Sequence, residues 1–215
     1  MKDINFKQAE DALFLEEEHI ILKDQIKKFV ETEVKPEGTK WEEEGFIPRE
    51  VFKKMGALGF LGITYPTEYG GSEMDVRGSV VFAEELGKST YSGFAIASLV
   101  HTDMASIHLL NAGNIEQKET YLPDIIKGNK ISCVAVTEPH AGSDVKNIRT
   151  KAQKVGNKYL INGSKIFITN GVHADIYFVA AKTSDGFQQS GNITMFIVRK
   201  DNPGLIVNKE LDKHG

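Results

Sequence analysis

A change of hydrophobic pattern near residue 130 constrains this chain more than any other feature. Before it, apolar residues recur at amphipathic-helix spacing, which predicts helices over residues 15–34, 48–59, 75–86, 93–110 and 115–126. After it, short runs rich in Val, Ile, Thr and Phe follow one another without helical segments between them. The predicted strands are residues 131–136, 148–155, 159–162, 165–169, 176–182, 193–199 and 205–211.

The turn signals in the second part fit closely spaced strands. Gly156-Asn157 and Asn162-Gly163 are dipeptides that favour tight hairpin turns. Several short strands at close spacing predict an antiparallel sandwich or barrel. We therefore expect an α+β chain with an N-terminal all-α helical domain over residues 1–130. An antiparallel β-barrel or sandwich domain is expected over residues 131–215.

Charge, cysteine and histidine usage exclude several functions. The net charge is -4 and no basic stripe is present, so no nucleic-acid partner is expected. Cys133 is the single cysteine, which excludes an intrachain disulfide and indicates a reducing, cytoplasmic compartment. No apolar stretch approaches the roughly 20 residues of a membrane span. His101 and His108 share one helix face, but without a third ligand no metal site is expected.

The segment VTEPHAGSD, residues 136–144, is a candidate ligand loop because it follows a predicted strand and ends in a Gly-Ser-Asp turn. Gly142 allows the backbone to approach a ligand closely, and Ser143 offers a hydroxyl donor. Such a loop can wrap a phosphate or pyrophosphate. The same residues suit a solvated turn in which Ser143 and Asp144 bond their own backbone, and the loop alone favours that interpretation.

The segment KIFITNG, residues 165–171, is the second candidate. If it is a strand, Phe167 and Thr169 point to the same face of the sheet. A flat ring beside a hydroxyl suits the floor of an isoalloxazine ring system. When the segment is considered alone, an ordinary strand with Phe167 in the core is the favoured interpretation.

Together, in this order and spacing, these segments resemble the acyl-CoA dehydrogenase family. The resemblance extends over nearly the whole chain through PTEYGGS (residues 66–72), GNIEQKETYLPDIIKG (113–128), DVKNIRTKA (144–152), YLINGSKIFITNG (159–171) and ADIYFVAAKT (174–183). Two departures are visible. His140 stands where many members have Gly, and Phe167 stands where some have Trp, although either ring can cover a flavin.

The resemblance implies an FAD site. Thr137 is expected near N1 and O2 of the flavin, where a donor stabilises negative charge on reduction, and the Thr169 hydroxyl near N5. Ser143 is expected near the pyrophosphate and the thioester substrate, and Ser190 near the CoA moiety. The implied cofactor-binding residues are Val134, Ala135, Val136, Thr137, Ser143, Phe167, Ile168 and Thr169.

The implied activity is α,β-dehydrogenation of an acyl-CoA to a trans-2-enoyl-CoA, a flavoprotein reaction of fatty acid β-oxidation, with electrons passed to an electron-transferring flavoprotein. The family's base is a Glu expected beyond Gly215, and its C-terminal helical domain, which builds a homo-oligomer, is also expected there. The chain alone is therefore expected to be inactive. Glu138 and Asp144 are expected to stabilise the loop by bonding backbone N–H groups.

Two readings of the activity stay open beside the dehydrogenase. One is an acyl-CoA oxidase-like relative, because oxygen access is not visible in a sequence. The other is a non-catalytic module that binds acyl-CoA or a protein partner without stable FAD. Leu99, Thr102 and Met104 are candidates to line an acyl pocket, although a core role predicts the same residue types.

Overall fold

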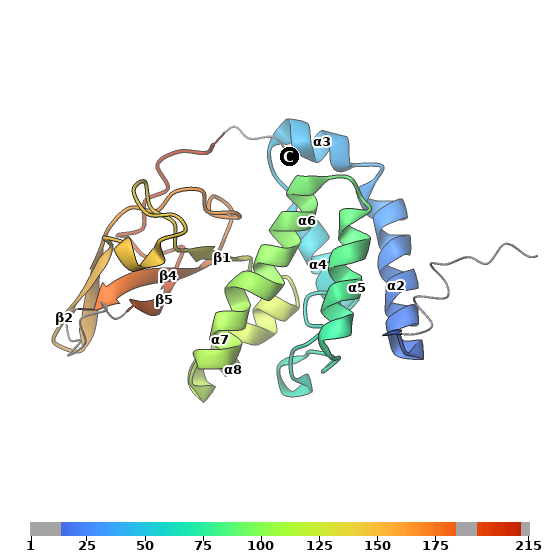
Figure 1. Cartoon of the computed structure of the whole chain (residues 1–215), viewed down its shortest axis with the longest axis horizontal. Coiled ribbons are helices and arrows are strands. Elements are labelled where there is room, and N and C mark those ends of the chain that lie inside the picture. The colour runs from blue at the N-terminus through green and yellow to red at the C-terminus, as the bar shows by residue number, and fades with distance from the viewer. Residues whose placement is uncertain (1–13, 184–192, 212–215) are drawn as a thin grey trace, which may run out of the picture.

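The computed structural model describes residues 14–183 and 193–211. Ser190, expected near the CoA moiety, lies outside the described residues. Within them, helices fill the first part of the chain and strands the second (Figure 1). The α+β expectation is confirmed.

The helices fall where the periodicity predicts them, and α3 is added. α2 (Glu17–Phe29) continues as a π-helical stretch, Val30–Val34, and α3 (Gly38–Glu44) follows. A 3-10 turn, Thr67–Tyr69, lies between α4 and α5. The remaining helices are α4 (Arg49–Ala57), α5 (Val76–Gly87), α6 (Ser92–Leu99), the π-helical stretch Val100–Ser106, α7 (Ile107–Ala112) and α8 (Ile115–Ile126).

Side-chain caps begin two of these helices. The Asp75 carboxylate accepts a hydrogen bond from Arg77 N at 2.8 Å and starts α5. At α8, Asn114 Oδ1 accepts from Gln117 N at 2.8 Å, and Gln117 Oε1 accepts from Asn114 N at 3.0 Å. This reciprocal pair is a capping box, which satisfies backbone donors that the helix itself leaves free.

The π-helical stretch Val100–Ser106, α7 and α8 pack with β4 in one buried cluster. The apolar faces of α2 to α6 form the other, larger core. Its larger side chains include fully buried aromatic rings from α4, α5 and α6 and from the α4–α5 connection. Burial of this area is the main stabilising contribution to the helical part. The core contains Ile26, Phe29, Trp41, Phe52, Met55, Phe60, Leu61, Phe82, Leu86 and Phe94.

One continuous helical stretch corrects the expectation that no segment is long enough to span a membrane. Ser92–Ala112 has 21 residues and a mean hydropathy of 1.2, and so passes that test by length and composition alone. Half of its apolar window is buried in the fold. It also carries His101, Thr102 and Ser106, which are buried and hydrogen-bonded within the protein. These properties are those of a core helix.

The described strands form one mixed sheet. β4 (Ile176–Thr183) pairs parallel with β1 (Ser132–Ala135), antiparallel with β5 (Ile193–Arg199) and, near its end, parallel with β2 (Lys151–Val155). β2 and β3 (Lys158–Asn162) form the hairpin that Gly156-Asn157 predicts, with Gly156 at φ +60°. A short 3-10 turn, Val145–Asn147, precedes β2.

The expected antiparallel pairing is found for β2–β3 and β4–β5 but is wrong for β1–β4 and β2–β4, and the barrel or sandwich is not confirmed. Residues 136–175 separate β1 from β4, and a connection of that length can return the chain for parallel pairing. Residues 165–169 and 205–211 are not strands, and Asn162-Gly163 does not form a hairpin. The sequence pattern predicts that strands adjacent in sequence pair with each other, whereas β4 pairs with the distant strand β1.

The central helical stretch lies against the sheet. α6 and α7 separate the strands from α2 and α5 (Figure 1). Ser132, in β1, hydrogen-bonds to His101 in the π-helical stretch, with 3.1 Å between Ser132 N and His101 Nδ1. β1 is consequently attached to the helical part at its first residue, directly before the candidate ligand loop.

Candidate functional site

The loop after β1, residues 136–144, is closed on itself and anchored by a buried carboxylate. Glu138 N donates to Ala141 O at 2.9 Å, and Ala141 N donates to Glu138 O at 3.1 Å. The Glu138 side chain points inward and is only 1% exposed. Its partners come from two other segments of the chain, so this residue connects the loop to the rest of the sheet.

Four protein donors satisfy the Glu138 carboxylate. Oε2 accepts from Arg149 N at 2.5 Å, and Oε1 accepts from Thr150 N at 2.9 Å and Thr150 Oγ1 at 2.5 Å. Lys165 Nζ donates to Oε1 at 2.8 Å and to Val136 O at 2.9 Å. His140 Nε2 also lies 3.2 Å from Oε2. Burial by itself would raise the pKa of Glu138, but the hydrogen bonds from Lys165, Thr150 and Arg149 outweigh it and lower the pKa to about 2.

A residue held in this way is a structural anion rather than a base. A general base needs a pKa near the working pH and free access to a proton. Glu138 has neither, so the expectation that it stabilises the loop agrees with the structure. Asp144 is exposed and accepts a hydrogen bond from Asn147 Nδ2.

The second segment lies beside this loop, although it is not a strand. Ile166 N donates to Thr137 O at 3.0 Å, which joins the two candidate segments backbone to backbone. Phe167 has φ +59° and Asn170 has φ +64°, so the chain turns sharply at both residues. The predicted alternation of side chains is lost at these positions. Phe167 and Thr169 therefore need not share a face as an extended chain would require.

The ends of this second segment are fixed to both parts of the molecule. Asn170 Nδ2 donates to Ala97 O in α6 at 2.9 Å and contacts Ser132 O in β1 at 3.3 Å. Tyr177 OH, from β4, donates to Gly171 O at 2.8 Å. A backbone in the left-handed region persists only where surrounding contacts hold it, and these bonds supply that support.

The predicted site residues occupy three kinds of environment. Phe167 is 58% exposed and Ser143 is exposed, with open space where a side chain on Gly142 would lie. Val134, Val136, Thr137, Ile168 and Thr169 are partly buried, and Ala135 is 4% exposed. Among the described residues, the hydroxyls of Ser143 and Thr169 have no protein hydrogen-bond partner. The two segments therefore present an exposed ring and two hydroxyls that can hydrogen-bond a ligand.

His101 is a buried crosslink. Its Nε2 donates to Ile125 O in α8 at 3.0 Å, and its Nδ1 accepts from Ser132 N at 3.1 Å. Burial lowers its pKa to about 4, so the ring is neutral near pH 7. Among the described residues, no group of His, Cys, Asp and Glu is placed to hold a metal ion.

The π-helical stretch Val100–Ser106 frees carbonyl groups, and polar side chains from within the stretch and from outside it satisfy them. Tyr65 OH donates to Thr102 O at 2.6 Å, and Ser106 Oγ donates to His101 O at 2.5 Å. Such π-helical turns are frequent at functional sites. This one carries His101, whose ring and carbonyl hydrogen-bond Ser132 at the start of β1.

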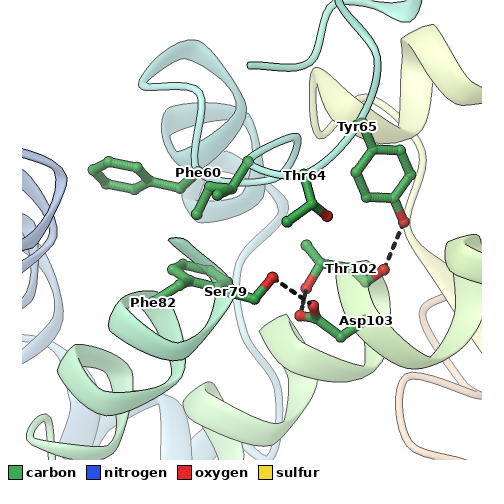
Figure 2. Close-up of a pocket in the computed structure, with 8 residues that line it drawn as sticks. Phe60, Thr64, Tyr65, Ser79, Phe82, Thr102 and Asp103 are labelled. Atoms are coloured by element: carbon green, nitrogen blue, oxygen red, sulfur yellow. Dashed lines mark hydrogen bonds between the residues drawn. The ribbon is translucent and has the colours of Figure 1, made fainter. Parts of the chain in front are cut away.

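The hollows of the described surface separate the three acyl-pocket candidates. Thr102 lines a small, half-open hollow of about 10 Å³ together with Tyr65, Ser79 and Asp103 (Figure 2), which has room for about one water molecule. Leu99 lines an open, mainly apolar hollow of about 290 Å³ with Tyr91 and Ile96. Met104 is 49% exposed and lines neither hollow. Thr102 is therefore a core residue, and Leu99 is the candidate beside space for a ligand.

Several positioning residues were missed because their role depends on contacts between distant segments. The sequence pattern predicts Lys165 only as the first residue of a strand and indicates no role for Arg49 or Asn170. Arg49 Nη1 bonds Asp175 Oδ2 at 2.8 Å across 126 positions of sequence. No local pattern reports such a pair; only the fold brings it together.

Fold and site together define an α+β protein in which two loops form a candidate ligand site where a mixed sheet meets a helical bundle. Comparison with known proteins identifies the family. The acyl-CoA dehydrogenase N-terminal domain matches residues 16–129, and the acyl-CoA dehydrogenase middle domain matches residues 133–215. The chain belongs to the acyl-CoA dehydrogenase family.

Individual relatives agree. An acyl-CoA dehydrogenase of Bacillus subtilis (strain 168) is 39% identical over 93% of this chain and 52% of its own length. The crystal structure of acyl-CoA dehydrogenase from Geobacillus kaustophilus has a TM-score of 0.83 and 41% identity, covering 89% of this chain and 50% of that one. An acyl-CoA dehydrogenase from Bacillus anthracis complexed with FAD has a TM-score of 0.85 and 34% identity, covering 93% and 34% of the two chains. The chain thus spans about half the length of the curated relatives it matches.

Proposed function

We propose that residues 1–130 and 131–215 form the helical and middle β domains of an FAD-dependent acyl-CoA dehydrogenase. The observation that carries the proposal is the junction of the two candidate segments. Ile166 N reaches Thr137 O at 3.0 Å, and Lys165 Nζ reaches Val136 O at 2.9 Å. Both contacts hold the backbone expected at the flavin edge next to the turn that carries Phe167 and Thr169.

The residues present fit an isoalloxazine and a pyrophosphate. Phe167 is 58% exposed, so its aromatic ring is accessible to a ligand. The Thr169 hydroxyl is available as a donor, and Ser143 with Gly142 leaves open space for an anionic group. Val134, Ala135, Val136 and Ile168 would contribute mainly backbone groups.

When bound, FAD supplies hydride acceptance from the β carbon of an acyl-CoA. The chain's own residues would hold and orient the cofactor. Phe167 would cover one face of the ring system, Thr169 would donate toward its reactive edge, and Thr137 would place a donor where negative charge develops. The α proton must leave to a carboxylate. Glu138, with all four of its described donors in place, is not available for that step.

The substrate and partners follow from the same proposal. An acyl-CoA thioester would be dehydrogenated to a trans-2-enoyl-CoA, and the electrons would pass to an electron-transferring flavoprotein. The acyl chain is assigned to the hollow of about 290 Å³ beside Leu99 and Ile96 in α6. Its apolar lining suits a hydrocarbon tail, whose transfer from water is favourable in proportion to the area buried.

The test is FAD binding by the chain, measured by equilibrium dialysis against the apo protein. We expect weak, saturable binding and no turnover of acyl-CoA, since the base and the rest of the enclosing surface are expected outside these residues. Phe167→Ala should weaken binding at least about tenfold, in line with the loss of a stacked ring. Phe14→Ala is the matched control, because Phe14 is also exposed, at 69%, but belongs to neither candidate segment.

The outcomes separate the alternatives. Absence of FAD binding by the wild-type chain, with acyl-CoA binding retained, would contradict the flavin proposal and favour the non-catalytic module. Equal loss in Phe167→Ala and Phe14→Ala would remove the site assignment. Turnover by the chain alone would contradict the assignment of the base and return Glu138 as a candidate.

A further inference from the structure

An ion pair between the helical part and the sheet lies next to the residues that precede the first candidate segment and follow the second. Arg49, the first residue of α4, binds the Asp175 carboxylate through two parallel hydrogen bonds. Nη1 bonds Oδ2 at 2.8 Å and Nη2 bonds Oδ1 at 2.9 Å. This fork-to-carboxylate geometry is the strongest and most directional form of a protein ion pair.

Each partner also holds the backbone of one segment. Arg49 Nη2 donates to His173 O at 2.8 Å, at the end of the turn that carries Phe167 and Thr169. Asp175 Oδ2 accepts from Ile131 N at 2.9 Å, at the residue that leads into β1 and the loop after it. A single pair therefore ties α4 to the residue that leads into β1, ahead of the first segment, and to the turn that follows the second.

The surroundings make this pair more than a surface contact. The Asp175 side chain is 17% exposed and that of Arg49 is 39% exposed. Burial by itself would raise the pKa of Asp175, but the hydrogen bonds from Arg49 and Ile131 N outweigh it and lower the pKa. The backbone of Asp175 is also fixed, since its N–H donates to Ile131 O at 2.8 Å and its carbonyl accepts from Lys200 N at 2.9 Å.

We propose that the Arg49–Asp175 pair is a positioning element of the cofactor site, fixing both flavin segments relative to the helix bundle. The inference rests on the proposed function for the identity of the ligand. Its structural content is independent of that identity: removal of Arg49 breaks the bond to His173 O and leaves Asp175, which holds Ile131 N, without its charged partner. Arg49 touches neither Phe167 nor the loop after β1, and it acts through His173 O and Asp175.

The experiment measures amide hydrogen exchange of the full chain in Arg49→Met, Arg49→Lys and Asp175→Asn. We expect Arg49→Met to speed exchange at residues 131–137 and 166–175 at least about tenfold, because charge-assisted hydrogen bonds are lost. Arg49→Lys keeps the charge without the fork and should have a smaller effect, about threefold. The double variant Arg49→Met/Asp175→Asn should exchange little faster than either single variant, because both substitutions remove the same interaction.

Lys54→Met is the matched control. Lys54 lies on the same helix and pairs with Glu33 at 2.5 Å, but both side chains are well exposed. It should leave exchange in both segments unchanged, in keeping with the small contribution of exposed pairs. Amides of α5 serve as an internal reference for global stability.

The results decide the inference in either direction. Selective loosening of both segments, with FAD affinity reduced in Arg49→Met but not in Lys54→Met, supports it. Wild-type exchange in Arg49→Met, or an equal increase throughout α5, would overturn it, as would unchanged FAD affinity despite loosened segments. If Arg49→Met does not fold, Arg49→Lys decides by the same criteria. Failure of the wild-type chain to bind FAD would contradict the proposed function alone, and the exchange data would still decide whether Arg49 orders both segments.

Discussion

Replacement of Glu138 by Gln tests whether the buried carboxylate holds the loop of residues 136–144 together. The substitution keeps the shape but removes the charge and turns one acceptor oxygen into a donor group. At Oε1 the carboxylate meets Thr150 and Lys165, and at Oε2 it meets Arg149 N. In either orientation, the amide of Gln faces a donor that it cannot satisfy.

Two arguments give the same magnitude for this loss. The removal of one partner from a buried ion pair costs about 3–5 kcal/mol. The lowering of the Glu138 pKa from 4.5 to about 2 corresponds to about 3 kcal/mol of stability at neutral pH. The side chain is 1% exposed, so solvent screening does not reduce this contribution much. We therefore expect Glu138→Gln to lower the free energy of unfolding by about 3 kcal/mol.

The assay is urea unfolding at pH 7 followed by circular dichroism. The midpoint should fall with the slope unchanged, and the melting temperature should drop by about 6–12 °C for a chain of this size. Because the folded-state pKa is depressed, the stabilisation is complete above about pH 4.5 and is lost as the pH falls toward about 2. The difference between wild type and Glu138→Gln should shrink over that window.

Asp144→Asn is the control, since Asp144 lies on the same loop but is exposed. It should change the stability by less than about 0.5 kcal/mol. A loss below about 1 kcal/mol in Glu138→Gln, or a difference from wild type that stays constant from pH 7 to pH 3, would refute the reasoning.

Three further predictions concern other positions. His101 has its pKa lowered to about 4, so stability should fall by about 3 kcal/mol as the pH drops from about 6.5 to about 4, and His101→Gln should lose this dependence in the same unfolding assay. Gly128 has φ +70°, and a Cβ there would lie 2.2 Å from Phe52 O, so Gly128→Ala should destabilise by about 2 kcal/mol or more in thermal unfolding; an unchanged midpoint would contradict the close approach. In a full-length protein, Thr169→Val should slow flavin reduction in stopped-flow experiments, and an unchanged rate would remove the role at N5.

Sequence patterns were sufficient for the local elements. Helix α4 begins after Pro48, α5 begins after Asp75, and α8 ends just before Gly128. These bounds follow from the sequence because capping and backbone geometry act over a few residues. The β2–β3 hairpin follows from Gly156-Asn157 for the same reason. The family also followed from sequence, since its motifs are linear and the family comparison confirms them.

Strand order could not be obtained in this way. The pairing of β4 with β1, β2 and β5 depends on where long connections return the chain, and hydrophobic alternation is the same for parallel and antiparallel partners. The segment 165–169 reads as a strand, but the bonds of Lys165 and Ile166 to the neighbouring loop, with Phe167 at φ +59°, make it a turn.

The candidate site divides along the same line. The sequence by itself determined which residue types stand in the two segments, including Ser143, Phe167 and Thr169. Only the tertiary structure decided how those segments are held. Glu138 and Lys165 join the two segments to each other, and the Arg49–Asp175 pair joins the chain next to them to α4. The physical reason is that a hydrogen bond or ion pair depends on distance in space, and partners 27 or 126 positions apart leave no periodic signal in the chain.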